Sequence, residues 1–444
     1  MGACISRIQR WIVAAGSRYL LAAACLLCAV PAAKSDDEVP EPLGSTTNDV
    51  MSSSVYQNSE EPNHGIAARE EKLDPTIGGW ISQGFTWNPA SPRDRYNGPV
   101  SFNDRANEYQ LNQLYLFIDR PAYFDAGHFG LGFRADMVFG TDAFQFQSYG
   151  FDDQIVSGNF STFYKLAFPQ LYLEAALPFA PDASVKFGKW YSPLGYESGL
   201  AAEDFFYSYP LAFNITPFTH TGILLDFPLN DQITTEIGLH RGMDVWEGDS
   251  SFWGYSCGIT WTSQDERTSI AFVMGSGPVS DSEDTPENAG DVGGSSAPKP
   301  RNQLLGIGGW LEYQWTERLR YAFNFDVLQM EDRRNDQPFT EAYAFTQSVF
   351  YDWSDRVTAG ARFELARDDD GGFIYGFRAD NPAAAGTYTN LTLGLNVRCG
   401  RRAILRPEVR WDWQNRDDSS ALPAFRDGRS NHQFLFATDL VVVF

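Results

Sequence analysis

From residue 76 to the C-terminus, apolar and polar side chains alternate along successive short segments. Between residues 129 and 139, Phe133, Ala135 and Met137 occupy one set of alternate positions, and Arg134 and Asp136 occupy the other. Successive side chains of a strand point to opposite faces of a sheet, so this pattern predicts a strand with one apolar and one charged face. A transmembrane barrel has this pattern because its outer face contacts lipid.

About sixteen segments of strand length carry this alternation, and an even number is typical of bacterial barrels. The pattern is weakest in 109–118 and 342–353, where polar residues occupy both faces. The predicted strands are 79–87, 109–118, 128–139, 169–178, 184–190, 219–227, 232–240, 252–262, 268–275, 303–315, 318–328, 342–353, 356–366, 387–398, 402–413 and 433–444.

The connections between these segments alternate in length. Those after the first, third, fifth, ninth, thirteenth and fifteenth segments are long, and those after even-numbered segments are short, for example 228–231 and 316–317. Outer-membrane barrels have short periplasmic turns and long external loops. The two patterns together predict an all-β fold, namely a transmembrane antiparallel up-and-down β-barrel over 76–444 with both termini in the periplasm.

The chain ends on an apolar strand pattern whose last residue is Phe444. A terminal aromatic residue on such a strand resembles the signal that the barrel-assembly machinery reads in outer-membrane proteins. We therefore expect Phe444 to be an assembly signal, with that machinery and outer-membrane lipid as partners. The expected location is the bacterial outer membrane.

The first 75 residues have a different character. Arg7, Arg10 and Arg18, an apolar stretch at 20–30 and small residues at 31–33 predict a signal peptide over 1–33. A lipoprotein leader acylated at Cys25 or Cys28 is the alternative. Residues 34–75 are rich in Ser, Glu, Asn and Pro and predict a disordered periplasmic linker. A short interaction peptide within this linker remains open.

Composition narrows the function. The formal net charge of −23 argues against nucleic acid, which is bound through Lys and Arg contacts to phosphate. The five histidines lack metal-ligand spacing, and no catalytic glycine-rich or serine motif occurs in its proper context. Only His220 and His240 could belong to a catalytic group at a barrel rim. We expect no catalysis, no cofactor and no metal.

Numerous charged residues fall on the non-lipid face of the predicted strands. Sixteen strands enclose room for an aqueous channel, and charges at these positions need water or partners. Pairing between opposite charges along the wall is the expectation for most of them, and direct contact with a solute remains open. The predicted wall charges include Arg134, Asp136, Lys186, Arg320, Asp326, Arg362, Glu364, Arg406, Glu408, Arg410 and Asp412.

The third long connection, 191–218, combines acidic and aromatic residues in an unusual density. A loop this aromatic is unsuited to bulk solvent, so we expect it to fold into the lumen and narrow it. Glu197, Glu203 and Asp204 would then face basic wall residues and form a constriction with a transverse field. The alternatives are that the loop caps the mouth of the barrel or packs against a neighbouring subunit.

Several short motifs resemble those of the bacterial outer-membrane porin family described as putative beta-barrel porin-2, OmpL-like. The motifs are Gly79-Trp80, the segments 132–136 and 140–142, Gly195-Tyr196-Glu197, His220-Thr221-Gly222 and the terminal Phe444. The resemblance runs from about Gly78 to the end of the chain. It implies a porin-like channel and, by analogy, a possible homotrimer. It fixes no solute and transfers no catalytic residue.

These observations favour a porin, a water-filled channel for passive diffusion of small hydrophilic solutes or ions. Acidic loops favour cations, although arginine residues on the wall could reverse that preference. The first rival is a structural or adhesive barrel that acts through its long external loops without significant transport. The second is a barrel enzyme, which would need an exposed histidine with an acidic or serine partner at the rim.

Overall fold

The computed structural model describes residues 75–444 except 123–129, 154, 157–162, 179, 181, 248–252, 280–301, 332–339, 370, 372, 375–384 and 420–421. The predicted signal peptide and nearly all of the predicted linker therefore lie outside the described residues. Within the described part, seventeen strands form one sheet, together with two short 3-10 helices, η1 (Asp142–Phe146) and η2 (Leu211–Asn214). No helix among these residues is long and apolar enough to cross a membrane.

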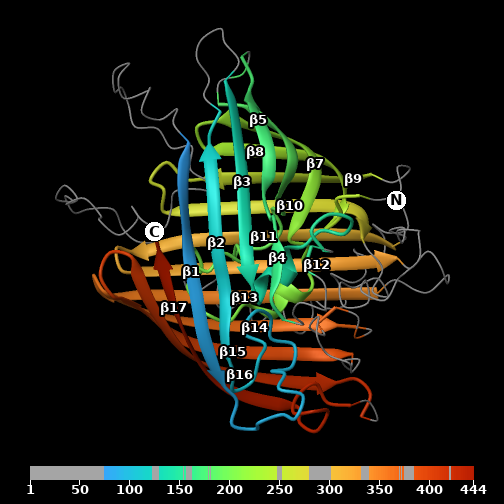
Figure 1. Cartoon of the computed structure of the whole chain (residues 1–444), viewed down its shortest axis with the longest axis vertical. Coiled ribbons are helices and arrows are strands. Elements are labelled where there is room, and N and C mark those ends of the chain that lie inside the picture. The colour runs from blue at the N-terminus through green and yellow to red at the C-terminus, as the bar shows by residue number, and fades with distance from the viewer. Residues whose placement is uncertain are drawn as a thin grey trace, which may run out of the picture. The chain divides into compact units, whose positions relative to one another are not determined.

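The strands follow one another around the sheet in chain order (Figure 1). They are β1 (Thr76–Trp87), β2 (Tyr109–Arg120), β3 (Leu131–Gly140), β4 (Lys165–Ala167), β5 (Leu171–Ala176), β6 (Ser184–Tyr191), β7 (Thr219–Asn230), β8 (Ile233–Met243), β9 (Gly254–Thr262), β10 (Thr268–Val279), β11 (Asn302–Thr316), β12 (Leu319–Glu331), β13 (Thr340–Ser354), β14 (Val357–Asp368), β15 (Gly386–Arg398), β16 (Ala403–Arg416) and β17 (His432–Val443).

The sheet closes on itself because β1 pairs antiparallel with β17 as well as with β2. At the junction, Gly79 and Phe444 exchange two backbone hydrogen bonds of 3.1 and 3.0 Å. Both β4 and β5 pair with β3, so the seventeen described segments occupy sixteen positions around the barrel. The prediction of a closed antiparallel barrel of about sixteen strands is confirmed.

The predicted strand 169–178 is the one whose course differs most from the structure. Its place is taken by β4 and β5, separated by residues 168–170. The backbone N–H of Phe168 donates to the Asp152 carboxylate at 2.7 Å instead of to the sheet. Pro169 has no N–H to donate, so the strand is interrupted at this point. The two weakest predicted segments, 109–118 and 342–353, are both long strands, β2 and β13, each with one register irregularity in its pairing.

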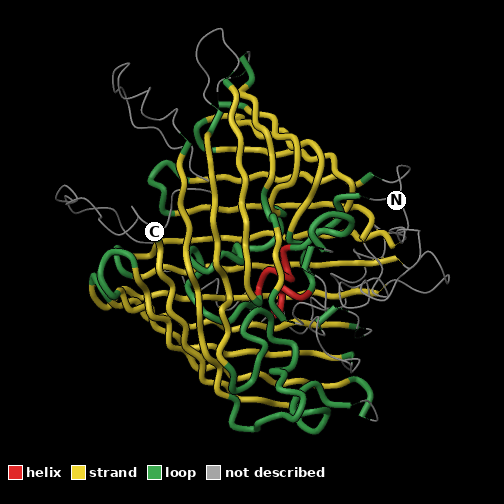
Figure 2. The backbone as a smooth tube through the Cα atoms, viewed as in Figure 1, coloured by secondary structure: helices red, strands yellow, loops and turns green. Residues whose placement is uncertain are grey.

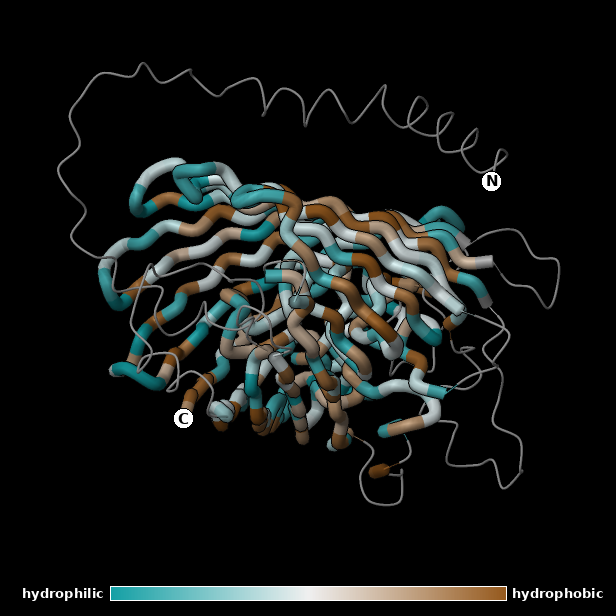
Figure 3. Tube along the Cα trace, turned by 90° about the horizontal axis from the view of Figure 1, so that it is seen from above, coloured by the Kyte–Doolittle hydropathy of each residue, from teal (hydrophilic) through white to brown (hydrophobic). Residues whose placement is uncertain are grey.

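The strands run around the barrel as one sheet (Figure 2), and hydrophobic and hydrophilic residues alternate along many of them (Figure 3). On β14, Phe363 is 45% exposed on the outer face, whereas its neighbours Arg362 and Glu364 are fully buried on the inner face. The same contrast holds on β16, where Trp411 is 46% exposed and Arg410 and Asp412 are buried. An exposed apolar outer band on every wall is what contact with lipid requires.

The connecting segments keep the predicted alternation in length. The long ones are 88–108, 141–164, 192–218, 280–301, 369–385 and 417–431, and the shortest are 231–232, 317–318, 355–356 and 399–402. Several described long connections fold inward. Residues of 88–108, 141–164 and 192–218 share one hydrophobic cluster, in which Phe102, Phe146 and Phe213 pack together. The interior of the barrel thus has a packed core.

Candidate functional site

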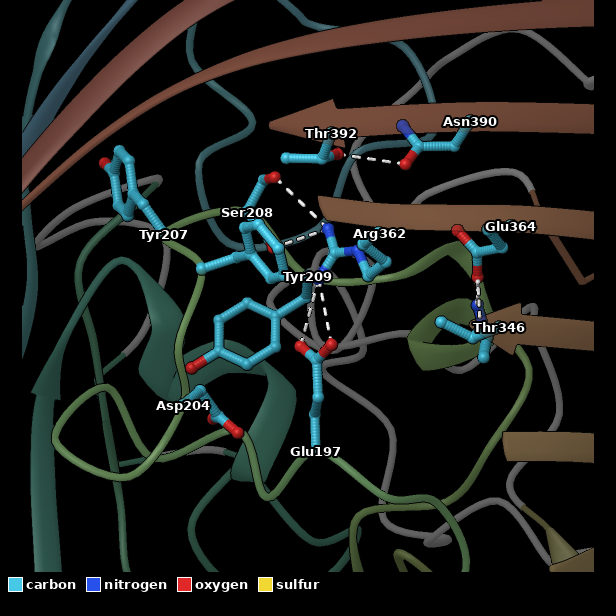
Figure 4. A network of polar contacts seen from close by, with 12 residues as sticks. Glu197, Asp204, Tyr207, Ser208, Tyr209, Thr346, Arg362, Glu364, Asn390 and Thr392 are labelled. Carbon is cyan, nitrogen blue, oxygen red and sulfur yellow. Dashed lines mark hydrogen bonds and ion pairs between the residues drawn. The ribbon is translucent and has the colours of Figure 1, made fainter. Parts of the chain in front are cut away.

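The segment 192–218, here called L3, crosses the interior of the barrel from β6 to β7. Its contacts are with inward-facing side chains of β14 and β16 on one wall and of β2 on another. The central part of this arrangement is drawn in Figure 4, where Glu197 and Ser208 of L3 point toward Arg362 of β14.

Arg362 on β14 is a wall residue that contacts L3 at several positions. One terminal nitrogen, Nη1, donates to both carboxylate oxygens of Glu197 at 2.9 and 3.1 Å. The other, Nη2, donates to the backbone oxygen of Ser208 at 2.7 Å (Figure 4). Its guanidinium also lies 4.7 Å from the ring centroid of Phe206. A single buried arginine therefore holds three separate positions of L3.

Two wall carboxylates accept hydrogen bonds from the backbone of L3. Glu364 accepts from the N–H groups of Leu211 at 2.7 Å and Ala212 at 3.0 Å, at the start of η2. Glu408 on β16 accepts from the N–H groups of Tyr207 at 3.0 Å and Ser208 at 3.2 Å. L3 has little regular structure, so its buried backbone groups depend on such partners.

Two further arginines bind the carbonyl groups of L3. Arg406 donates to the backbone oxygen of Asp204 at 2.7 Å, and Arg410 donates to that of Tyr209 at 2.6 Å. Each is also paired with a wall carboxylate, Arg406 with Asp439 at 2.5 Å and Arg410 with Asp412 at 2.9 Å. These charges are consequently neutralised in pairs while they fix the loop.

On the β2 wall, polar amides complete the support of L3. Gln113 donates to the backbone oxygen of Gly199 at 2.9 Å and accepts from the N–H of Ala201 at 3.1 Å. The hydroxyl of Tyr207 donates to Asn112 at 2.9 Å. Sequence reasoning missed both amides because uncharged polar residues on a strand give no strong signal.

The three acidic residues predicted for a constriction all lie in L3 but have different surroundings. Glu197 is paired with Arg362, and burial nevertheless raises the pKa of its carboxyl to about 7. Burial likewise raises the pKa of Asp204 to about 6, opposed by a hydrogen bond from the N–H of Ser198 at 3.0 Å. Glu203 is only partly buried. Glu197 is partly buried as well, so burial alone does not separate these two carboxylates.

The other predicted wall charges form ion pairs or hydrogen bonds mainly with other wall residues. Arg134 pairs with Asp136 at 2.8 Å. Lys186 approaches Asp226 at 4.0 Å, and Arg320 pairs with Glu312 at 3.3 Å, with partly exposed side chains in both pairs. Glu312 also accepts from the hydroxyl of Tyr196 in L3 at 2.5 Å. Asp326 accepts a hydrogen bond from Asn324 at 2.7 Å.

Another buried cation, Lys189 on β6, was missed by the sequence pattern. Its Nζ donates to the backbone oxygen of Phe146 at 2.9 Å and to Asp152 at 3.2 Å, which fixes the segment 141–164. The preceding Gly188 has a φ of +139°, where glycine is favoured. Strict alternation cannot be extended through this irregular position, so the pattern did not place Lys189 inside.

The two candidate catalytic histidines do not form an exposed rim site. His220 and His240 are buried, with ring centroids 4.2 Å apart, and His220 contacts Gly242 and Ser192. In the part of the chain that the structure describes, no group of three or more His, Cys, Asp or Glu residues is placed to hold a metal ion.

Comparison with solved structures reveals barrels of the same fold. OmpT of Vibrio cholerae matches with a TM-score of 0.52 and 10% identity, covering 83% of this chain and 97% of that one. The outer-membrane channel DcaP of Acinetobacter baumannii matches with a TM-score of 0.52 and 11% identity, covering 84% and 97%. An anion-selective porin from Comamonas acidovorans matches with a TM-score of 0.51 and 8% identity, covering 84% and 99%.

No curated protein sequence matches the chain. The family model described as "Putative beta-barrel porin-2, OmpL-like" matches residues 75–444, which is the whole barrel. Together with the closed barrel, its apolar outer face and its porin-like neighbours, this match identifies an outer-membrane channel protein whose location is the bacterial outer membrane. The chain belongs to the putative beta-barrel porin-2, OmpL-like family of porins.

Proposed function

We propose that the barrel conducts small hydrophilic solutes or ions by passive diffusion, through a passage that L3 narrows. The observation that carries this proposal is the set of hydrogen bonds between L3 and the β14, β16 and β2 walls. A loop held inside the barrel by buried charges leaves for solutes only the space that its own side chains do not fill. Width and lumen charge, rather than tight binding, would then select the solute.

The passage is narrow under this proposal. Aromatic residues of L3 pack on both sides of the loop, for example Phe213 against Phe102 and Phe206 against Phe350. Because many of the wall charges near L3 are paired, their net field is weaker than their number suggests. Glu203 is a partly buried acidic residue of L3, and its negative charge would favour cations over anions.

Orientation and targeting belong to the same proposal. Both termini lie in the periplasm, the short turns face the periplasm, and residues 1–33 direct export. Residues 34–75 then form a periplasmic linker, and Phe444 is read by the assembly machinery. The exposed apolar outer face supports contact with lipid. A trimeric form is recorded for OmpT of Vibrio cholerae, which supports a homotrimer for this chain as well.

A structural or adhesive barrel without transport is the second candidate function. The specific observation that favours it is the hydrophobic core inside the barrel, where Tyr209, Phe213 and Phe218 of L3 pack with residues of the other inward-folded segments. A barrel closed at this level would be silent, and its loops would act outside the cell.

Electrical recording of the purified, refolded protein in a planar bilayer distinguishes a channel from a structural or adhesive barrel. Stepwise ohmic openings support the channel, and a reversal potential in a salt gradient gives the sign of selectivity. We expect cation preference, which Glu203→Gln should reduce. Asp355→Asn, in the short turn between β13 and β14, is a matched control that should leave selectivity unchanged. Well-folded protein that never opens would favour the structural barrel.

A further inference from the structure

A small cavity lies between L3 and the β12–β13 wall. It is about 10 Å³ in volume, on the order of one water molecule or one small ion. Glu197 and Thr216 line it from L3, and Asn324, Asp326 and Thr346 line it from the wall. The side-chain atoms that these five residues could offer to a ligand are almost all oxygens.

Asn324 and Asp326 each have one side-chain oxygen that is buried without a hydrogen-bond partner. Asn324 is 5% exposed and Asp326 is fully buried. The amide nitrogen of Asn324 donates to Oδ2 of Asp326 at 2.7 Å, which fixes the orientation of both groups. Oδ1 of Asn324 and Oδ1 of Asp326 accept no hydrogen bond. Unsatisfied buried acceptors are costly, and in native proteins they usually have a partner.

Asp326 also differs from its neighbours in its electrostatic surroundings. Glu197 is paired with Arg362, and Glu364 accepts two backbone N–H groups of L3. Among the described residues, no Lys, Arg or His lies within ion-pair distance of Asp326, and the charged group that acts on it is the carboxylate of Glu364. When Asp326 is ionised, no positive group of the described residues compensates its charge at this point of the wall.

We infer that this cavity binds a monovalent cation of the sodium or potassium type, held by Asp326, Asn324 and the oxygens of L3. Hard cations without strict geometry take carboxylate, amide and hydroxyl oxygens as ligands. A single positive charge compensates a single unpaired carboxylate. The absence of a cluster of three acidic or histidine ligands among the described residues disfavours a divalent or transition metal here.

The bound cation would link L3 to the β12 wall, whereas Arg362 links L3 to β14. Arg362 holds Glu197 from β14, whereas Asp326 and Asn324 belong to β12. The cation thus stabilises the folded protein by an amount that depends on its concentration, because the unfolded chain has no such site.

Thermal unfolding in detergent tests whether a bound cation stabilises the protein, without any measurement of transport. At equal ionic strength, the midpoint temperature should be several degrees higher in potassium chloride than in choline chloride, because choline is too large for the cavity. Asp326→Asn should abolish this difference. Glu236→Gln, which removes a carboxylate from β8 outside the cavity, should preserve it. An equal midpoint in both salts for the unchanged protein would overturn the inference.

Diffraction from crystals grown with thallium acetate gives a second, independent readout. Thallium(I) substitutes for potassium and scatters anomalously, so a peak between Asp326 and Glu197 is expected in the unchanged protein and not in Asp326→Asn. No peak in the unchanged protein would mean that the cavity holds water or that the carboxyl is protonated. Displacement of thallium by calcium at much lower concentration would indicate a divalent site. Either result would overturn the inference.

Discussion

At the scale of single residues, charged side chains of the inner wall form hydrogen bonds with the backbone of L3 rather than facing open solvent. Arg362 and Arg410 donate to carbonyl oxygens of the loop, and Glu364 and Glu408 accept from its N–H groups. Hydrogen bonds to charged groups contribute roughly 1.5–3 kcal/mol each to stability. Several of them are enough to order a loop that has no β-sheet hydrogen bonds.

Replacement of Arg362 by alanine should destabilise the protein strongly. It would leave the carboxylate of Glu197 and the carbonyl of Ser208 buried without a partner, and breaking a buried ion pair costs about 3–5 kcal/mol. Denaturant unfolding of the detergent-solubilised barrel measures the loss.

Arg367→Ala is the matched control for that experiment. Arg367 lies on the same strand and pairs with Asp369 and Asp417, whose side chains are 38% and 43% exposed. Partly exposed pairs contribute about 0–1 kcal/mol, so the free energy of unfolding should change little. Equal losses for the two variants would show that L3 does not depend on Arg362.

Asp142 should make stability depend on pH. Burial raises its pKa from 3.8 to about 7, opposed by hydrogen bonds from Asn112 at 2.8 Å and Gln113 at 3.0 Å. Between these two pKa values the folded form keeps a proton that the unfolded form has released. The stabilising contribution is therefore complete below about pH 4 and is lost as the pH rises to about 7.

Asp142→Asn removes this titration. Its stability relative to the unchanged protein should be greater at about pH 8 than at about pH 5, as measured by the midpoint temperature at both values. Gln145→Ala, in the same 3-10 helix, carries no titrating group and should show no such trend. A pH-independent difference for Asp142→Asn would mean that this carboxyl titrates normally in the folded barrel.

At the scale of elements, the strands follow from alternation alone because lipid and interior impose opposite chemistry on the two faces. β14 and β16 were predicted within a few residues, since Phe363 and Trp411 alternate with charged neighbours. The pattern fails where backbone chemistry intervenes. Pro169 interrupts the strand between β4 and β5, and the positive φ of Gly188 accompanies the buried Lys189.

The terminal strand carries a prediction about assembly. Phe444 is 51% exposed on the outer face, and its backbone hydrogen bonds to Gly79 do not depend on its side chain, so its ring adds little to the stability of the folded barrel. Phe444→Ser should lower the amount of folded barrel in cells several-fold while leaving refolding in detergent unchanged. Heat-modifiable electrophoretic mobility reports the folded fraction.

Phe434→Ser provides the comparison for this variant. Phe434 is 39% exposed and lies on the same outer face of β17, ten residues before the end. If the terminal position carries the signal, this substitution should assemble normally. Equal defects in both variants would mean that general hydrophobicity of the strand, not the last residue, directs assembly.

At the scale of the whole molecule, the sequence predicted the barrel, its closure near sixteen strands and the inward folding of the third long connection, whose role as a constriction stays a prediction. It could not predict which wall residues meet L3, because those pairs are separated by up to about two hundred positions, as for Tyr207 and Glu408. It also did not anticipate the hydrophobic core that Phe102, Phe146 and Phe213 form inside the barrel, since long connections carry no periodic signal.

The central claim is that L3 sets the width of the passage. The most direct measurement is single-channel conductance of the unchanged protein and of a variant in which residues 200–212 are replaced by a short glycine-serine linker. A variant with the connection 417–431 shortened controls for the loss of an external loop. We expect low conductance for the unchanged protein, a severalfold increase for the L3 variant and little change for the control. Equal conductance with and without L3 would contradict it.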